Sequence, residues 1–90
     1  MSRIVITHNT VDPDKWSKFT SEREEAFEEF FGGGNVVDYV AQDGSNFVAV
    51  AADVDDVDAV MAALSSPPAE LEAAMERHGV LPPMAVFVEK

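Results

Sequence analysis

Aromatic residues recur every three or four positions between residues 12 and 34, and glutamates occupy many of the positions between them. This spacing places an apolar stripe on one face of a helix. The stripe consists of Trp16, Phe19, Arg23, Phe27 and Phe30. Asp12 suits the N-cap, Pro13 suits the first helical position, and the triple glycine at 32–34 suits the C-terminal end. The pattern predicts one amphipathic helix over 12–34, with Arg23 as a charged residue on its apolar face.

Short runs rich in Val, Ile, Phe and Tyr are typical of β-strands. They lie at 3–9, 36–42, 47–52 and 84–89. Asp43-Gly44 favours a tight hairpin between the second and third runs, because this pair tolerates positive φ angles. The first and third runs are apolar at successive positions, which is typical of central strands whose two faces are both covered.

A second helical region follows the third strand, and two prolines divide it. Asp55 is the predicted N-cap of its first part, which carries the stripe Val57, Val60, Met61 and Leu64. Because proline removes a helical hydrogen bond, a new helix is predicted over 67–78, ended by Gly79. Leu71, Ala74, Met75 and His78 lie on its predicted inner side.

The element order β-α-β-β-α-β, with the second α split in two, predicts a ferredoxin-like α+β fold in one domain spanning 1–90. Right-handed crossovers place all helices on one face of a four-stranded antiparallel sheet. The other face is apolar in the same pattern and has no cover within the chain. Since soluble monomers rarely expose large apolar patches, we expect a homodimer that packs sheet on sheet.

The chain carries a net charge of −11, from 17 acidic and 6 basic residues. This charge argues against nucleic acid and against an anionic membrane surface as partners. Self-repulsion that favours solubility explains it, and adaptation of the source to salt is the alternative. No apolar run approaches the roughly 20 residues of a membrane span, and the N-terminus is too polar for a signal peptide, so a cytoplasmic location is expected. With no cysteine, two separated histidines and no phosphate-binding motif, we expect neither a metal nor an organic cofactor.

Several stretches resemble one known group of proteins: Ile-Val-Ile-Thr-His-Asn-Thr-Val at 4–11, Asp-Lys-Trp at 14–16, Ser-Ser-Pro-Pro at 65–68, His-Gly-Val at 78–80 and Pro-Pro at 82–83. On these stretches the chain is similar to the small antibiotic-biosynthesis-monooxygenase-like and "cyclase"-labelled members of the dimeric α/β-barrel superfamily. The resemblance implies the fold and the dimer. It implies no single activity, because such relatives include cofactor-independent oxygenases, haem-degrading enzymes, isomerases and proteins without assigned activity.

Four polar residues are candidate catalytic groups. Arg23 can bind an anionic oxygen with its planar fork, or it can pack its stem on aromatic neighbours and pair with a carboxylate. His8, on the face of Ile4 and Ile6, and His78, at a helix end, can move protons, although either can be a structural residue. The resemblance adds Asn9, because an asparagine near the end of this strand contacts substrate or oxygen in the oxygenase and haem-degrading relatives. The tryptophan that those relatives carry on the second helix is missing here.

Four further residues are candidate ligand contacts, although their spacing also suits plain core positions: Trp16, Phe27, Tyr39 and Met75. The sequence leaves three functions open. The favoured one is a module that binds a small aromatic or polyketide-like acid, and the alternatives are a cofactor-independent monooxygenase or cyclase-type enzyme and a structural dimer without a ligand. An enclosed cavity of about 300 Å³ or more with convergent polar groups would favour a ligand, whereas a filled core would favour the structural dimer.

Overall fold

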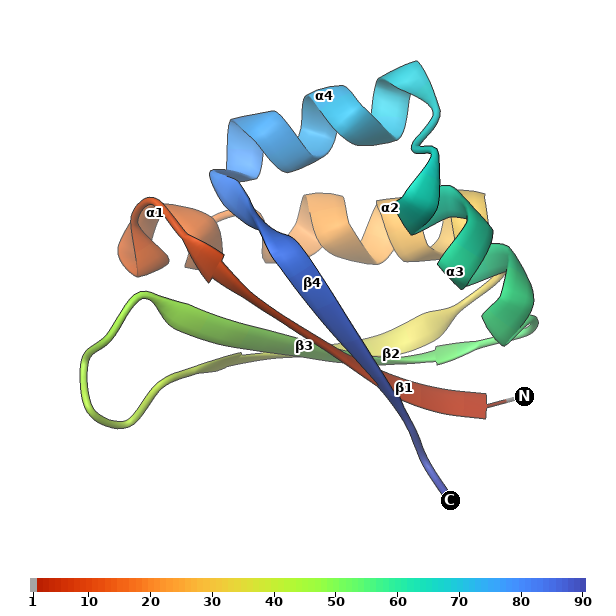
Figure 1. The fold of residues 1–90 in the computed structure, drawn as a ribbon, viewed down its shortest axis with the longest axis horizontal. Coiled ribbons are helices and arrows are strands. Elements are labelled where there is room, and N and C mark those ends of the chain that lie inside the picture. The colour runs from red at the N-terminus through yellow and green to blue at the C-terminus, as the bar shows by residue number, and fades with distance from the viewer. Residues whose placement is uncertain (1) are drawn as a thin grey trace.

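The computed structural model describes residues 2–90, which form a four-stranded sheet and four helices (Figure 1). The elements in chain order are β1 (Ser2–Thr10), α1 (Pro13–Ser17), α2 (Thr20–Phe31), β2 (Gly34–Val40), β3 (Phe47–Val54), α3 (Val57–Ser65), α4 (Ala69–His78) and β4 (Val80–Val88). The strands are arranged in the order β2-β3-β1-β4, and each neighbouring pair is antiparallel. The predicted ferredoxin-like α+β topology is therefore confirmed.

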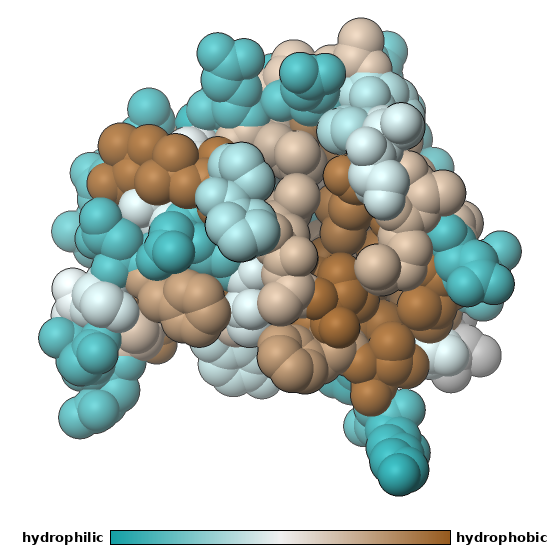
Figure 2. All heavy atoms as spheres, in the orientation of Figure 1, coloured by the Kyte–Doolittle hydropathy of each residue, from teal (hydrophilic) through white to brown (hydrophobic). Residues whose placement is uncertain are grey.

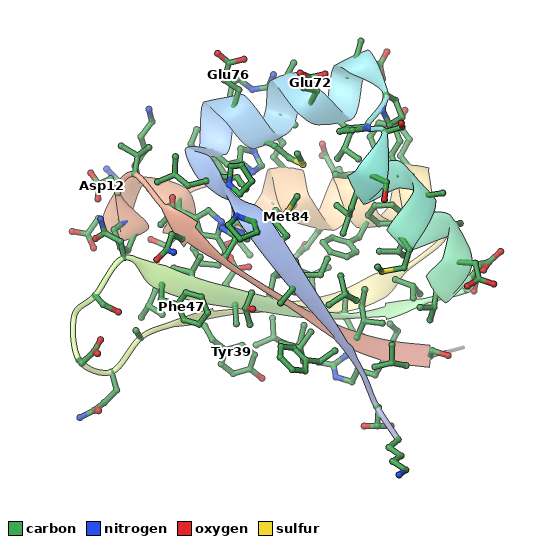
Figure 3. The ribbon with its side chains drawn as sticks, viewed as in Figure 1. Asp12, Tyr39, Phe47, Glu72, Glu76 and Met84 are labelled. Atoms are coloured by element: carbon green, nitrogen blue, oxygen red, sulfur yellow. The ribbon has the colours of Figure 1, made fainter. Side chains whose placement is uncertain are left out.

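All four helices lie over one face of the sheet (Figure 1). Side chains alternate between the two faces along each strand, and the core contains those of the inner sheet face together with side chains from one side of each helix. The core residues are Ile4, Ile6, Val48, Val50, Ala52, Val54, Trp16, Phe27, Phe31, Val60 and Leu71. On the opposite face, Tyr39 and Phe47 point away from the helices and are about half exposed (Figure 3).

The prediction of one helix over 12–34 is wrong, because the chain turns at Lys18 and Phe19 between α1 and α2. Asp12 caps α1 as predicted, accepting hydrogen bonds from the backbone amides of Asp14 and Lys15. At the turn, the Ser17 hydroxyl donates to the Asp14 carbonyl at 2.9 Å, and such local side-chain bonds compete with helical ones. Helix α2 then ends at Phe31, and Gly32 follows as its C-cap with a φ of 60°, which glycine adopts readily.

Other boundaries also differ from the prediction. Asp56, not Asp55, caps α3 and accepts from the Asp58 amide at 2.9 Å. Helix α4 begins at Ala69 rather than Pro67, since Pro68 keeps an extended backbone. Strand β4 begins at Val80 rather than at position 84, and its prolines fit because β4 is an edge strand.

Strand β4 bulges opposite His8. Thr7 pairs with Ala85 and Asn9 pairs with Leu81, so three residues of β4 span the place of one residue of β1. Bulges of this kind bend the edge of a sheet and redirect side chains. Among residues 2–90, no helix is long and apolar enough to cross a membrane.

Val50→Asp should unfold the protein, because Val50 is 4% exposed on the inner sheet face and an unpaired carboxylate there costs several kcal/mol. We expect the free energy of unfolding, obtained from urea denaturation followed by circular dichroism, to fall by about 3 kcal/mol or more. Met61→Asp is the control, since Met61 is 46% exposed on α3 and should change stability by about 0.5 kcal/mol or less. An unchanged midpoint for Val50→Asp would contradict this packing.

Candidate functional site

A cavity of about 70 Å³ lies between the inner face of the sheet and the helices. Its apolar lining includes Ile6, Val50, Phe27, Leu71, Met75 and Met84. Four polar residues complete the lining, namely His8 from β1, Trp16 from α1, Arg23 from α2 and His78 from the end of α4. The cavity is much smaller than the roughly 300 Å³ at which ordinary ligand sites begin.

The structure thus brings six of the eight sequence-predicted site residues to one cavity: His8, Trp16, Arg23, Phe27, Met75 and His78. The other two lie elsewhere. Asn9 is exposed and belongs to the opposite sheet face, because side chains alternate along β1. Tyr39 is 52% exposed on that same bare face (Figure 3).

Arg23 is held by a carboxylate that the sequence analysis did not single out. Its Nε donates to Asp38 Oδ1 at 3.1 Å and its Nη2 donates to Asp38 Oδ2 at 2.7 Å. Nη2 also donates to the Trp16 carbonyl at 2.7 Å, and the guanidinium carbon lies 3.9 Å from the centre of the Trp16 ring. Thr20 donates to Asp38 Oδ2 at 2.6 Å, so the carboxylate has three donor contacts. Arg23 is therefore a buried ion-pair and stacking residue, with its charge compensated.

Asp38 is the residue that sequence reasoning missed. It lies on the helix-facing side of β2, where its neighbours Val36 and Val40 share that side. A lone carboxylate between apolar residues of one strand face, in a chain with a lone arginine on one helix face, is a signal for a buried pair. Finding that signal requires knowing which face of β2 meets α2.

His78 is buried at the end of α4, stacked on Phe19 with ring centroids 4.6 Å apart. Its Nδ1 lies 3.3 Å from Arg23 Nη1, and arginine can only donate, so Nδ1 carries the lone pair and Nε2 carries the proton. Nε2 is 3.3 Å from Glu22 Oε2, yet it is outside hydrogen-bond geometry and has no other partner within residues 2–90. Glu22 also pairs with Arg77 at the surface.

His8 has the opposite proton arrangement. Its Nδ1 lies 2.8 Å from the backbone carbonyl of Asn9, which can only accept, so Nδ1 is protonated and Nε2 has the lone pair. No hydrogen bond reaches Nε2 from the described residues 2–90. The ring meets Trp16 edge-on, with centroids 6.0 Å apart. His8 therefore presents a neutral proton acceptor beside the cavity.

Both histidines are neutral at pH 7. Burial lowers the pKa of His8 below its ordinary value of 6.5, and the Arg23 charge adds to this, against the raising effect of the Asn9 carbonyl. Burial also lowers the pKa of His78, where Glu22 opposes and Arg23 reinforces the shift. Among residues 2–90, no three His, Cys, Asp or Glu side chains are grouped so that they could hold a metal ion.

Glu22→Gln should lower the pKa of His78 further and leave that of His8 unchanged, because Glu22 raises only the former. NMR titration of the two imidazole C–H signals measures both values, and exposed Glu25→Gln on α2 is the control. Because the folded pKa lies below the unfolded one, the stabilisation from each neutral histidine is complete above about pH 6.5 and is lost as pH falls through the folded pKa. Equal changes in both histidines would contradict this assignment.

No protein-family model and no curated protein matches the sequence. Solved structures do match. A provisionally assigned antibiotic biosynthesis monooxygenase from Bordetella bronchiseptica has a TM-score of 0.72 and 12% identity, covering 99% of this chain and 94% of its own. The cofactor-independent oxygenase SnoaB from Streptomyces nogalater has a TM-score of 0.63 and 18% identity, covering 99% of this chain and 92% of its own. A provisionally assigned monooxygenase of the same name from Deinococcus radiodurans has a TM-score of 0.58 and 11% identity, covering 100% and 91%. Identities this low show the fold alone. The chain thus has the ferredoxin-like fold of antibiotic-biosynthesis-monooxygenase-like proteins, which the resemblance in its sequence implied.

Proposed function

We propose that this protein binds a small aromatic or polyketide-like weak acid in the cavity between the helices and the sheet. The observation that carries the proposal is the neutral His8, whose Nε2 is without a partner in residues 2–90 and whose ring lines an otherwise largely apolar cavity. A few placed polar groups within an apolar lining are typical of ligand sites.

The charges favour a phenol or an enol over a carboxylate. Asp38 already compensates the Arg23 charge through two hydrogen bonds, so little positive charge is left for an ionised acid. His8 Nε2 instead accepts a hydrogen bond from a hydroxyl group. The nearby guanidinium still stabilises partial negative charge on that oxygen, because a low-dielectric site strengthens electrostatic interactions.

The resting cavity of about 70 Å³ must widen to admit an aromatic ring. Met75 and Met84 line it, and methionine adapts its shape readily because it has three rotatable bonds. Leu64 of α3 also lines the cavity, and the surface between α3 and β4 is apolar (Figure 2). We therefore expect the ligand to enter between these two elements.

A cofactor-independent monooxygenase or cyclase-type enzyme is the second candidate. His8 supports it, because a neutral imidazole within reach of a ligand hydroxyl can act as a general base. The fold likeness to the cofactor-independent oxygenase SnoaB is consistent with this candidate. The missing second-helix tryptophan favours binding over oxygenation, and a structural dimer without a ligand remains the outcome if no aromatic compound binds.

We also propose that two copies pack through their bare sheet faces. The row Val37, Ala51, Val5 and Phe87 runs across all four strands, since these residues pair in register. The next row is Tyr39, Ala49, Thr7 and Ala85. Phe87 is 59% exposed and Tyr39 is 52% exposed, so a second copy would bury a wide apolar face.

Ala74→Leu should abolish binding of aromatic compounds, because Ala74 lines the cavity and the added carbons would occupy it. Ala73→Leu, exposed on the adjacent position of α4, is the matched control and should bind normally. Thermal shift with phenols measures the effect. Wild-type protein should gain several degrees at saturating ligand, as expected when a ligand binds only the folded state. Equal shifts for both variants would place the binding site elsewhere.

Phe87→Asp should split the dimer while preserving the fold, because a carboxylate in the apolar sheet face would lose its water on assembly. Sedimentation should give twice the chain mass of 9.8 kDa for the wild type at micromolar concentration and the chain mass for the variant. Met61→Asp changes a similarly exposed residue on a helix and should stay dimeric. A monomeric wild type would refute the proposed assembly.

A further inference from the structure

Trp16 carries a buried donor that the fold does not use. The side chain is fully buried, and its Nε1 has no hydrogen-bond partner within residues 2–90. A buried indole N–H normally finds an acceptor, because leaving it unpaired forfeits its hydration. The same residue lines the cavity, so the missing acceptor can come from an occupant.

The Trp16 ring is held by its neighbours and cannot easily turn to find another acceptor. Arg23 lies over its face at 3.9 Å and bonds its backbone carbonyl at 2.7 Å. His8 meets the ring edge-on with centroids 6.0 Å apart. These contacts favour an aromatic ring at this position, but none of them needs the indole nitrogen. Packing alone therefore does not explain why the N–H is buried here.

We infer that the cavity recognises a hydroxyl group through two hydrogen bonds. The Trp16 Nε1–H donates to the ligand oxygen, and His8 Nε2 accepts a hydrogen bond from the ligand hydroxyl. This inference rests on the proposed ligand-binding function and narrows its ligand to phenols and enols. A hydroxyl group can donate and accept at once, and so it satisfies both side chains. An ether satisfies only the indole, and an ionised carboxylate has no proton for His8.

Phenol, anisole and toluene separate these contacts, because they share one ring and differ in the polar group. Phenol offers a donor and an acceptor, anisole an acceptor, and toluene neither. We expect affinity to fall about fivefold from phenol to anisole and again from anisole to toluene, as typical hydrogen bonds would give. Trp16→Phe should remove the preference for anisole over toluene, and His8→Leu the preference for phenol over anisole.

The wild-type protein offers a test that needs no variant. Its single tryptophan gives one indole N–H signal in a ¹H–¹⁵N spectrum. Phenol and anisole should shift this signal and slow its hydrogen exchange, whereas toluene should not slow it. Ring-current effects are common to the three ligands, so the difference between anisole and toluene isolates the hydrogen bond. If Trp16→Phe does not fold, a benzothienylalanine at position 16 keeps the ring shape without the N–H.

The outcomes separate the two proposals. If none of the three compounds binds, the proposed function fails and this inference fails with it. If all three bind with equal affinity and the indole signal exchanges at its original rate, the cavity takes aromatic rings and the two-point recognition is refuted. If anisole binds as tightly as phenol while slowing indole exchange, the His8 contact is refuted. A graded order with a protected indole supports the inference.

Discussion

The buried ion pair between Arg23 and Asp38 is the interaction on which the site depends. Both side chains are nearly inaccessible, at 8% and 12% exposure, so each charge has lost most of its water. Two parallel hydrogen bonds and the Thr20 hydroxyl compensate for that loss. Removing either partner would leave an unpaired charge in the interior, which typically costs about 3–5 kcal/mol. The pair also joins β2 to α2, and its Arg23 contacts both Trp16 and His78.

The proton arrangement of the two histidines follows from backbone and ion-pair geometry rather than from the histidines themselves. The Arg23 guanidinium forces the lone pair of His78 onto Nδ1, whereas the Asn9 carbonyl forces the proton of His8 onto Nδ1. Two residues of one type thus have opposite roles around one cavity. Because β4 bulges opposite His8, His8 has no paired residue in β4, unlike its neighbours Thr7 and Asn9.

Local pattern was sufficient to predict the order of the elements, the central strands and the inner-facing positions of His8 and His78. It was insufficient where tertiary contacts override propensity. The break between α1 and α2 is one such place, because Arg23 reaches back to the Trp16 carbonyl across a turn that an amphipathic stripe does not indicate. Asp38 is another, because pairing a strand residue with a helix residue requires the register of β2. Asn9 was assigned to the site by the family resemblance and Tyr39 by its aromatic side chain, but strand alternation places both on the bare face.

The sheet therefore separates two surfaces of different chemistry. Its inner face contributes Asp38 and His8, which lie among the hydrogen-bonding groups that Arg23 of α2 and His78 of α4 bring to the same layer. Its outer face has two largely apolar rows. The polar Asn9, between Phe47 and Leu81, lies at one end of these rows, and the Arg3–Asp53 ion pair lies at the other. Since a polar face would hinder sheet packing and an apolar cavity alone would not orient a ligand, the two properties constrain different strand positions. Period-two alternation lets one set of strands satisfy both, with odd positions of β1 facing one surface and even positions facing the other.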